Sequence, residues 1–181
     1  DGPCLRQLGP WTRTRRAGRL EPRLNANARN PAQPMHKWKT KTDPLFRGDS
    51  AHGFTPPDPS ASPSIVRHVL YLGGANRPSP YKSTSEDRSA AQHFAGTAGN
   101  VYRTDVPSLK QAGVRHISRR ELLKLLRGSG FGDGNRPSAY EVAQARRYVE
   151  AWAEHLVDFR PKSQLSQQEL LDLLSTIFHR V

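Results

Sequence analysis

After residue 43 the sequence is divided into short segments, and their patterns constrain the fold more than any other feature. Asn100–Val106 alternates apolar and polar residues, as a half-buried strand does. Ser118, Ser138 and Ser166 each precede a helically periodic segment, where a serine side chain caps the first turn. Short strands interleaved with helices, without long parallel β–α–β units, predict a mixed α+β domain.

The same patterns predict where the individual elements lie. Residues 55–64 contain four prolines, which exclude a helix interior and predict a polar loop. Thr84 or Ser85 is expected to cap the helix that follows them. We expect a strand or brief helix at 65–72, helices at 85–95, 119–126 (ended by Gly128), 139–150 and 167–179, and strands at 100–106, 114–117 and 155–159.

Positive charge is concentrated near the N-terminus. The chain has 181 residues, which suits one domain with an arm, and its net charge is +12. Residues 1–43 hold ten Lys and Arg against three Asp and Glu, and residues 44–181 keep a net charge of +5. We therefore divide the chain into a basic Pro/Gly/Arg-rich arm at 1–43 and a folded domain at 44–181.

Two interpretations of the arm stay open. Its low apolar content is typical of a disordered linker or of the remnant of an upstream region. Alternatively, Arg13, Arg15 and Arg16 bind the phosphates of a nucleic acid target, while Trp11 and Trp38 stack on bases. In both cases the positive field attracts polyanions.

Composition argues against several kinds of site. The single cysteine, Cys4, excludes an intramolecular disulfide framework and a cysteine-built metal site. The seven histidines show no HxxxH or HxH spacing, so we expect no metal cofactor. We expect no membrane span and no signal peptide, because no long apolar run is present. The chain begins at Asp1, so we interpret it as a piece of a longer polypeptide, with an internal start at Met35 as the alternative.

Three segments carry residues suited to a catalytic or binding site. Leu45-Phe46-Arg47-Gly48 is an apolar run that ends in an arginine and a glycine. Residues 81–85 are Tyr-Lys-Ser-Thr-Ser, an aromatic followed by closely spaced hydroxyls. Glu154 comes directly before the apolar run of residues 155–159.

An arginine, a Ser-Thr-Ser segment and a late glutamate, in this chain order, resemble the R-S-E signature of mono-ADP-ribosyltransferase toxins of the cholera and pertussis type. The resemblance covers residues 44 to about 162 and rests on a handful of positions. It implies a mainly antiparallel, split β-sheet with flanking helices, and NAD as the substrate. The implied reaction splits NAD and transfers ADP-ribose to a macromolecule.

The resemblance also implies a role for individual residues. Arg47 contacts the phosphate and ribose of NAD, Ser83 orders the site, and Glu154 is catalytic. These residue types suit the chemistry, since arginine binds phosphate with paired donors and a carboxylate stabilises an oxocarbenium-like transition state. Further candidates for NAD binding are Gly48, Tyr81, Thr84, Ser85 and Phe94, of which Tyr81 and Phe94 would cover the nicotinamide ring.

Simpler explanations compete at each position. Arg47 could pair with Asp49 at a strand end, and Glu154 could end the charged face of a helix. Phe94 on a helix is more often a core residue, and Lys82 and Arg88 are solvated charges by default. Arg47-Gly48-Asp49 as an integrin ligand is a common chance match.

The resemblance breaks down at Trp152. Many of these toxins carry Glu or Gln two residues before the catalytic glutamate, where it engages the acceptor, whereas this chain has Trp152. Arginine-directed protein modification is therefore disfavoured. An indole at that position could stack on a nucleobase, so we expect Trp152 to contact structured RNA, with a core position as the competing interpretation.

The basic, Pro/Gly-rich lead-in resembles the region before the C-terminal toxin of a bacterial Rhs-type polymorphic effector. This resemblance implies a monomeric toxin that is injected into rival cells, acts in their cytoplasm and is neutralised by a dedicated, acidic immunity protein. Two other functions compete with the transferase. One is a non-catalytic nucleic-acid-binding module, and the other is an NAD glycohydrolase that uses water as the acceptor.

Overall fold

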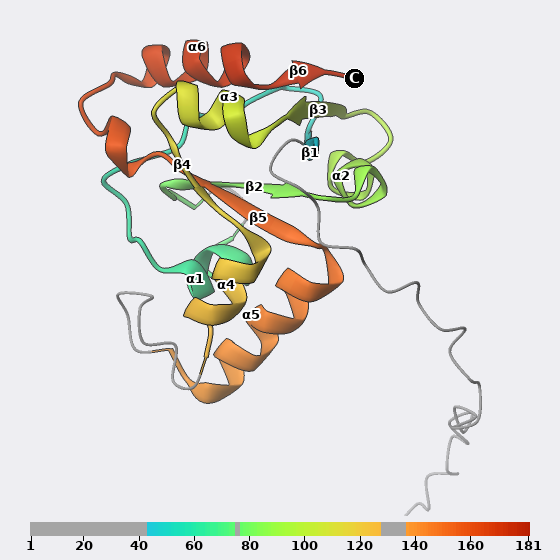
Figure 1. Cartoon of the computed structure of the whole chain (residues 1–181), viewed down its shortest axis with the longest axis vertical. Coiled ribbons are helices and arrows are strands. Elements are labelled where there is room, and N and C mark those ends of the chain that lie inside the picture. The colour runs from blue at the N-terminus through green and yellow to red at the C-terminus, as the bar shows by residue number, and fades with distance from the viewer. Residues whose placement is uncertain (1–42, 75–76, 128–136) are drawn as a thin grey trace, which may run out of the picture. The chain divides into compact units, whose positions relative to one another are not determined.

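A computed structural model describes residues 43–74, 77–127 and 137–181 of the chain. They form an α+β fold around a six-stranded sheet with the strand order β4-β5-β2-β1-β3-β6 (Figure 1). All five pairings between neighbouring strands are antiparallel. The elements are β1 (Leu45–Asp49), α1 (Ile65–Val69), β2 (Tyr81–Ser85), α2 (Arg88–Ala95), β3 (Asn100–Thr104), α3 (Val106–Gln111), β4 (Arg115–Ile117), α4 (Arg119–Leu125), α5 (Ala139–Ala151), β5 (Glu154–Asp158), η1 (Arg160–Lys162), α6 (Gln167–Ile177) and β6 (His179–Arg180).

The sheet has a narrow connection at its centre. β1 and β3 are aligned over five residue pairs, and so are β2 and β5. In contrast, β1 and β2 share a single pair, Phe46 with Ser85. The sheet therefore has two parts, β4-β5-β2 and β1-β3-β6, which are joined only at the C-terminal end of β2. The other residues of β1 and β2 do not pair with each other.

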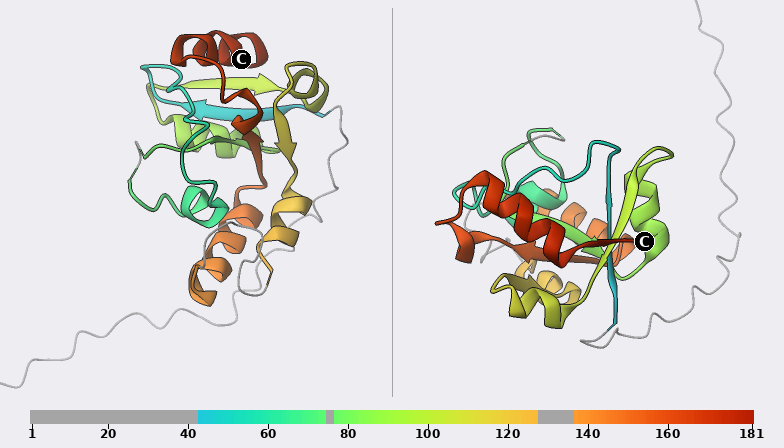
Figure 2. Two further views of the ribbon diagram at one scale, coloured as in Figure 1. Left: turned by 90° about the vertical axis from the view of Figure 1, so that its left-hand side faces the viewer. Right: turned by 90° about the horizontal axis from the view of Figure 1, so that it is seen from above.

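Helices cover both faces of the sheet (Figures 1 and 2). α1, α4 and α5 pack on one face, where Leu156 and Ile117 meet Val66, Leu122 and Val149 in one apolar cluster. α3 and α6 pack on the other face. The members of that second cluster are Leu45, Leu109, Val114, Val157, Phe159, Leu170, Leu174, Ile177 and Phe178.

α2 lies directly against β1, and Gly48 makes this contact possible. A Cβ atom at Gly48 would lie 1.9 Å from the carbonyl oxygen of Ala91 and 2.6 Å from the backbone nitrogen of Ala95. Ala91 and Ala95 are themselves small, and with Val101 they form a compact cluster. The glycine in Leu45-Phe46-Arg47-Gly48 is thus explained by backbone packing.

The structure corrects the predicted start of the helix after the Ser-Thr-Ser segment. Neither Thr84 nor Ser85 is a cap, because both belong to β2. Asp87 caps α2 instead, since its side chain accepts a hydrogen bond from the backbone N–H of Ser89. The Ser85 hydroxyl is used elsewhere and donates to the carbonyl oxygen of Trp152 at 2.6 Å.

Other predicted elements agree or shift by a few residues. The capping serines of α4, α5 and α6 are confirmed, as Ser118, Ser138 and Ser166 each accept from a backbone N–H. The strand predicted to reach Val106 ends at Thr104, because Asp105 caps the unpredicted helix α3. Residues 65–72 contain a short helix, and the last helix ends at Ile177 so that β6 can pair with β3. Gly128 and all of the predicted arm except Asp43 lie outside the described residues.

A candidate active-site pocket

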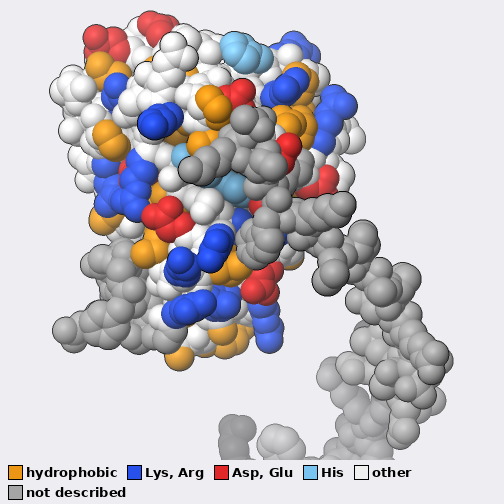
Figure 3. Space-filling view, in the orientation of Figure 1, with side chains coloured by type: hydrophobic (Ala, Val, Ile, Leu, Met, Phe, Trp, Pro, Cys, Tyr) orange, Lys and Arg blue, Asp and Glu red, His pale blue; other side chains and the backbone are white. Residues whose placement is uncertain are grey.

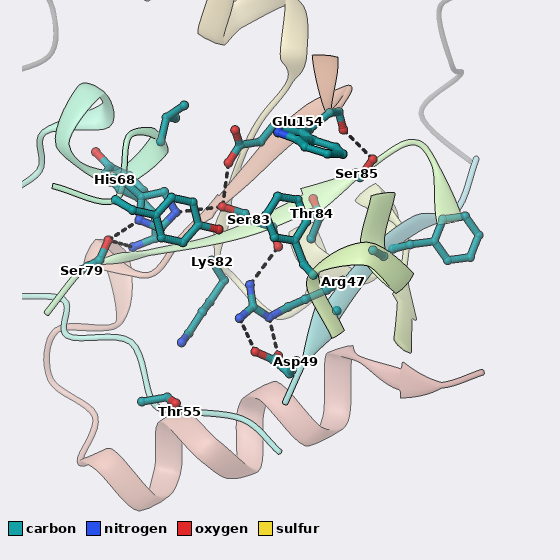
Figure 4. A pocket seen from close by; sticks show the side chains of 18 of the residues that line it. Arg47, Asp49, Thr55, His68, Ser79, Lys82, Ser83, Thr84, Ser85 and Glu154 are labelled. Carbon is teal, nitrogen blue, oxygen red and sulfur yellow. Dashed lines mark hydrogen bonds and ion pairs between the residues drawn. The ribbon is translucent and has the colours of Figure 1, made fainter. Parts of the chain in front are cut away.

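A pocket of about 640 Å³ opens where β1, β2 and β5 come together (Figure 4). Its lining includes Arg47 from β1, Ser83 from β2 and Glu154 from β5, along with His68 from α1 and Phe94 from α2. Polar groups thus gather on the strands, and two of the aromatic rings, Phe94 and Tyr148, come from helices. This combination of a concave shape with converging polar groups is typical of a small-molecule site.

Ser83 links the other two predicted catalytic residues. Its hydroxyl donates to Glu154 Oε1 at 2.6 Å, although 71 positions separate the two residues in sequence. Its backbone carbonyl oxygen accepts from Arg47 Nη1 at 2.9 Å. One residue of β2 therefore fixes the side chains of an arginine on one neighbouring strand and a glutamate on the other (Figure 4).

His68 extends this contact into a chain of hydrogen bonds. Its Nε2 lies 2.9 Å from Ser83 Oγ, and its Nδ1 lies 2.7 Å from Ser79 Oγ. The Ser83 hydroxyl donates to Glu154, so it accepts from Nε2–H of His68, and Nδ1 then accepts from Ser79. The pKa of His68 is well below its usual value, because the ring is desolvated and because Arg77, Arg47 and Lys82 are nearby cations. A neutral His68 satisfies every member of the chain.

Glu154 is a buried carboxyl group with a raised pKa. Its residue is 7% exposed. Burial raises the pKa to about 7, against the opposing effects of the Ser83 hydrogen bond and the charge of Arg77. The group can therefore exchange a proton near neutral pH, which suits a residue that stabilises positive charge and then accepts a proton.

The backbone before Glu154 is held in an uncommon conformation. Ala153 has a φ of 45°, in the left-handed region that non-glycine residues rarely adopt. This turn carries the chain from α5 into β5. It is held by the end of β2, because the N–H of Glu86 donates to the carbonyl oxygen of Ala153 at 3.1 Å and the Ser85 hydroxyl donates to Trp152.

Arg47 has acidic and backbone partners on three of its nitrogens. Nε and Nη2 donate to the two carboxylate oxygens of Asp49, each at 2.6 Å, and Nη1 donates to Ser83. The strand-end pair with Asp49, the simpler explanation considered from the sequence, is thus present. Arg47 nevertheless lines the pocket, with its charge offset by Asp49.

Lys82 is a buried lysine inside the pocket. It lies on β2 and is 9% exposed, so the sequence-based interpretation of a solvated charge is wrong. Tertiary packing explains the difference, because Lys82 pairs with Val157 of β5 and its side chain lies in the pocket. The pKa of Lys82 is lowered to about 7 by burial and by the charge of Arg47, while Asp49 acts in the opposite direction.

Aromatic side chains surround the opening of the pocket, and we call Tyr71, Phe94, Tyr148 and Trp152 the aromatic rim. Phe94 lies 5.1 Å from Trp152 and 6.4 Å from Tyr71 between ring centroids. Phe94 is 45% exposed and therefore is not the core residue that its helical position suggested. Trp152 is half-buried, and its indole also stacks on His93 at 5.1 Å.

A second polar cluster lies next to Glu154. His155, the next residue on β5, places Nε2 2.9 Å from Glu86 Oε1 and Nδ1 2.8 Å from His116 Nε2. Burial and the neighbouring His155 lower the pKa of His116 to about 4, so His116 is neutral at neutral pH. Arg119 approaches Glu86 at 3.4 Å and is buried as well. This cluster holds the beginning of strand β5 in place and thereby supports the position of Glu154.

The structure brings most of the predicted site residues to one place. Arg47, Ser83 and Glu154 line the pocket, as do Gly48, Tyr81, Thr84, Ser85, Phe94 and Trp152. Tyr81 is buried and donates its hydroxyl to the carbonyl oxygen of Pro63, so its ring belongs to the pocket wall and the core. Arg13, Arg15 and Arg16 lie outside the described residues.

Sequence reasoning did not find His68, Lys82, Tyr71 or Arg77 as site residues. Arg77 donates to the carbonyl oxygens of His68 and Gly74, and its guanidinium lies 4.7 Å from the centroid of the Tyr71 ring. A lone histidine without a spaced partner carries no signal. For Lys82 the sequence offered one usable signal of a site residue, a lysine directly before Ser-Thr-Ser in a strand that otherwise has only aromatic and hydroxyl side chains.

Comparison with known proteins adds no assignment. The chain matches no protein-family model, no curated protein and no solved structure. Among the described residues, no group of His, Cys, Asp and Glu side chains is arranged to hold a metal ion. Within the same part of the chain, no helix is both long enough and apolar enough to cross a membrane.

Proposed function

We propose that this chain is an NAD-dependent mono-ADP-ribosyltransferase toxin domain with an ADP-ribosyltransferase-like fold. The observation that carries the proposal is the position of Ser83 between Arg47 and Glu154, with contacts of 2.9 Å and 2.6 Å. Arg47 is 36 positions from Ser83 in sequence and Glu154 is 71 positions from it, yet both contact Ser83. The pocket in which they meet is large enough for a ligand. The narrow connection between β1 and β2 also fits the split sheet that the resemblance implies.

The reaction breaks the bond between the nicotinamide nitrogen and the anomeric carbon of its ribose. The electron pair of this bond goes to the nicotinamide, which leaves as a neutral ring, and positive charge develops on the ribose. The Glu154 carboxylate stabilises that charge, as carboxylates do in glycosidases. The acceptor nucleophile then bonds to the anomeric carbon and gives its proton to Glu154, whose pKa of about 7 suits this step.

The remaining residues orient this machinery. Ser83 directs the Glu154 carboxylate, and neutral His68 holds the Ser83 hydroxyl in the donating orientation. Arg47 is held by Asp49 and presents a fixed guanidinium to the phosphate and ribose of NAD. Side chains held in this way need no rearrangement as the transition state forms.

Structured RNA is the acceptor that the surface favours over protein. The aromatic rim offers exposed rings at the pocket opening, with Tyr71, Phe94 and Tyr148 each between 45% and 46% exposed. Unstacked bases of RNA bind such rings by stacking. Figure 3 shows Lys and Arg side chains gathered over α4 and α5, the helix that carries Tyr148. The basic residues of α4 and α5 that are not buried are Arg120, Lys124, Arg146 and Arg147.

Labelled NAD tests the proposed function and the acceptor together. The protein is incubated with a cell extract and NAD that is labelled in the adenylate part, and the product is treated with nuclease or with protease. We expect label in macromolecules that nuclease releases, and we expect its yield to fall steeply between roughly 50 and 200 mM salt. Label that resists nuclease and disappears with protease would contradict the RNA acceptor. Free ADP-ribose as the only product would identify a glycohydrolase.

Tyr148 and Tyr140 provide a matched pair of variants for the aromatic rim. Both are exposed tyrosines on α5, but only Tyr148 lines the pocket. We expect Tyr148→Ala to lower the modification of RNA by about tenfold, since stacking on one ring is worth about 1–3 kcal/mol. Tyr140→Ala should leave it unchanged, and neither variant should change NAD hydrolysis. Equal losses in the two variants would contradict a role for the rim.

The wider biological setting belongs to the same proposal. We infer an Rhs-type toxin that is delivered into rival bacteria and acts in their cytoplasm, where an acidic immunity protein neutralises it. The net charge of +5 on residues 44–181 supports an acidic partner. Co-expression with a candidate immunity protein, followed by measurement of complex formation and of NAD cleavage, tests this part.

A further inference from the structure

We propose that Lys82 is the anion-binding residue of this pocket and that it binds the diphosphate of the ligand. This inference rests on the proposed function, in which the ligand is a dinucleotide. It assigns the free positive charge of the pocket to Lys82, a residue that the R-S-E resemblance does not single out. Arg47 then acts mainly as a positioned donor, and Lys82 as the cation that an incoming phosphate meets.

The first argument is the state of the Lys82 side chain. It is 9% exposed, lines the pocket, and makes no hydrogen bond or ion pair with any described residue. Buried lysines are rare and are normally paired with an acid, because desolvation of the ammonium group is costly. A buried lysine that has no partner among the described residues and points into a pocket is explained by a partner that arrives with the ligand.

The second argument is the distribution of charge around Lys82. Asp49, the nearest carboxylate of β1, already binds Arg47 through both oxygens at 2.6 Å. The other charged or titratable side chains that line the pocket are His68, which is neutral, and Glu154, Arg77, Tyr71, Tyr81 and Tyr148. Lys82 and Arg77 are thus the pocket cations that no described acid contacts directly, and Arg77 already donates to the carbonyl oxygens of His68 and Gly74, whereas Lys82 makes no such bond.

The third argument is the position of Lys82 relative to the predicted reaction centre. In Figure 4, Lys82 points away from Glu154, toward the part of the pocket that holds Asp49 and Thr55. In this view Ser83 lies between the two groups, and Arg47 lies beside Lys82. In NAD the diphosphate likewise lies on one side of the nicotinamide ribose and is separated from its anomeric carbon by the sugar. The Glu154 carboxylate at one end of the pocket suits the anomeric carbon, and the Lys82 ammonium group at the other end suits the diphosphate.

A measurable consequence is proton uptake on binding. The pKa of Lys82 is about 7 in the free protein, since burial and the adjacent Arg47 disfavour its charge. A bound diphosphate favours the charged form and raises this pKa again. At pH 8 the free lysine is mostly neutral, so binding takes up on the order of one proton. Glu154, with a pKa of about 7, is also mostly deprotonated at pH 8, so the proton is assigned to Lys82 by loss of the uptake in both Lys82→Met and Lys82→Arg.

The test is isothermal titration calorimetry at pH 8 in two buffers of different ionisation enthalpy. The ligands are ADP-ribose, inorganic pyrophosphate and nicotinamide riboside, which has no phosphate. The variants are Lys82→Met, which removes the charge, and Lys82→Arg, which keeps a permanent one. We expect Lys82→Met to weaken binding of the first two ligands by on the order of tenfold to hundredfold, with nicotinamide riboside unaffected. We expect Lys82→Arg to bind them without proton uptake.

Unchanged binding of ADP-ribose and pyrophosphate by Lys82→Met would overturn the inference, as would binding by the wild-type protein without proton uptake. Thermal unfolding shows whether the variant is folded. The folded state disfavours the charged lysine, so the wild-type protein should lose stability as the pH falls from about 10.5 to 7, and Lys82→Met should not.

The inference and the proposed function can fail separately. If Lys82→Met cleaves NAD with an unchanged KM, the role of Lys82 is refuted and the transferase stands. If pyrophosphate binding depends on Lys82 but the wild-type protein does not cleave NAD, the anion site stands and the proposed function is refuted.

Discussion

Replacing Ser83 by alanine should change the pH dependence of NAD cleavage in a specific way. The Ser83 hydroxyl donates to Glu154 at 2.6 Å and lowers the pKa of that carboxyl, which burial has raised to about 7. Without this hydrogen bond, a higher pH is needed to ionise Glu154. Catalysis requires the ionised form, so the acid limb of the pH profile of kcat/KM should move to higher pH.

The size of the effect follows from the strength of the contact. A hydrogen bond to a charged group contributes about 1.5 kcal/mol, which is roughly a tenfold change in the acid dissociation constant of Glu154. At pH 7 the wild-type carboxyl is about half ionised and the variant about one-tenth ionised, so activity should fall roughly fivefold. At pH 9 both are almost fully ionised, and the ratio of the two activities should approach one. The assay is nicotinamide release between pH 5.5 and 9.5.

Ser60→Ala is the matched control for Ser83→Ala. Ser60 is an exposed serine outside the pocket whose hydroxyl also donates to a carboxylate, that of Asp58, at 2.6 Å. Its removal should leave the profile unchanged. A loss of activity in Ser83→Ala that is the same at every pH would refute the reasoning, because it would show that Ser83 does not act through the ionisation of Glu154.

The remaining predictions concern stability and the hydrogen-bond chain. Glu154→Gln should be more stable than the wild-type protein at pH 8 by roughly 2 kcal/mol in urea unfolding. The raised pKa of Glu154 makes the wild type lose stability as the pH rises from about 4.5 to 7, so equal stability at pH 8 would contradict the cost of burying the charged carboxylate. Gly48→Ala should lower the free energy of unfolding by about 3 kcal/mol or more, since its Cβ would lie 1.9 Å from Ala91 O; a thermal midpoint within a degree of wild type would contradict it. His68→Ala should lower kcat at pH 7 by at most the roughly fivefold expected of Ser83→Ala, with little change in KM, because the Ser83 hydroxyl loses the donor that orients it; an effect confined to KM would assign His68 to ligand binding instead.

The sequence predicts most of the fold because local signals and the tertiary structure agree. The capping serines of α4, α5 and α6 work through contacts within one turn, so they are readable without the fold. The start of α2 was mispredicted because Thr84 and Ser85 have two possible uses. They can cap a helix or extend a strand, and pairing of β2 with β5 decides for the strand.

The candidate site was predicted only in part. Arg47, Ser83 and Glu154 were selected because their residue types and order resemble the R-S-E signature; all three line one pocket, and their catalytic roles stay a prediction. The surroundings of these residues could not be predicted from the sequence, since Lys82 is buried by a pocket that segments far apart in the chain form together. His68 could not be predicted at all. Its role depends on hydrogen bonds to Ser79 and Ser83, which are 11 and 15 positions away in sequence and are brought close only by the fold.

The most direct test of the account is release of nicotinamide from NAD by the purified protein and by two glutamine variants. Glu154 lies in the pocket, whereas Glu150 is an exposed glutamate four residues earlier on α5, and Glu150→Gln is therefore the control. We expect the wild-type protein and Glu150→Gln to release nicotinamide equally. Glu154→Gln should be slower by on the order of a hundredfold or more while still binding NAD. No release by the wild-type protein, or equal release by Glu154→Gln, would contradict the account.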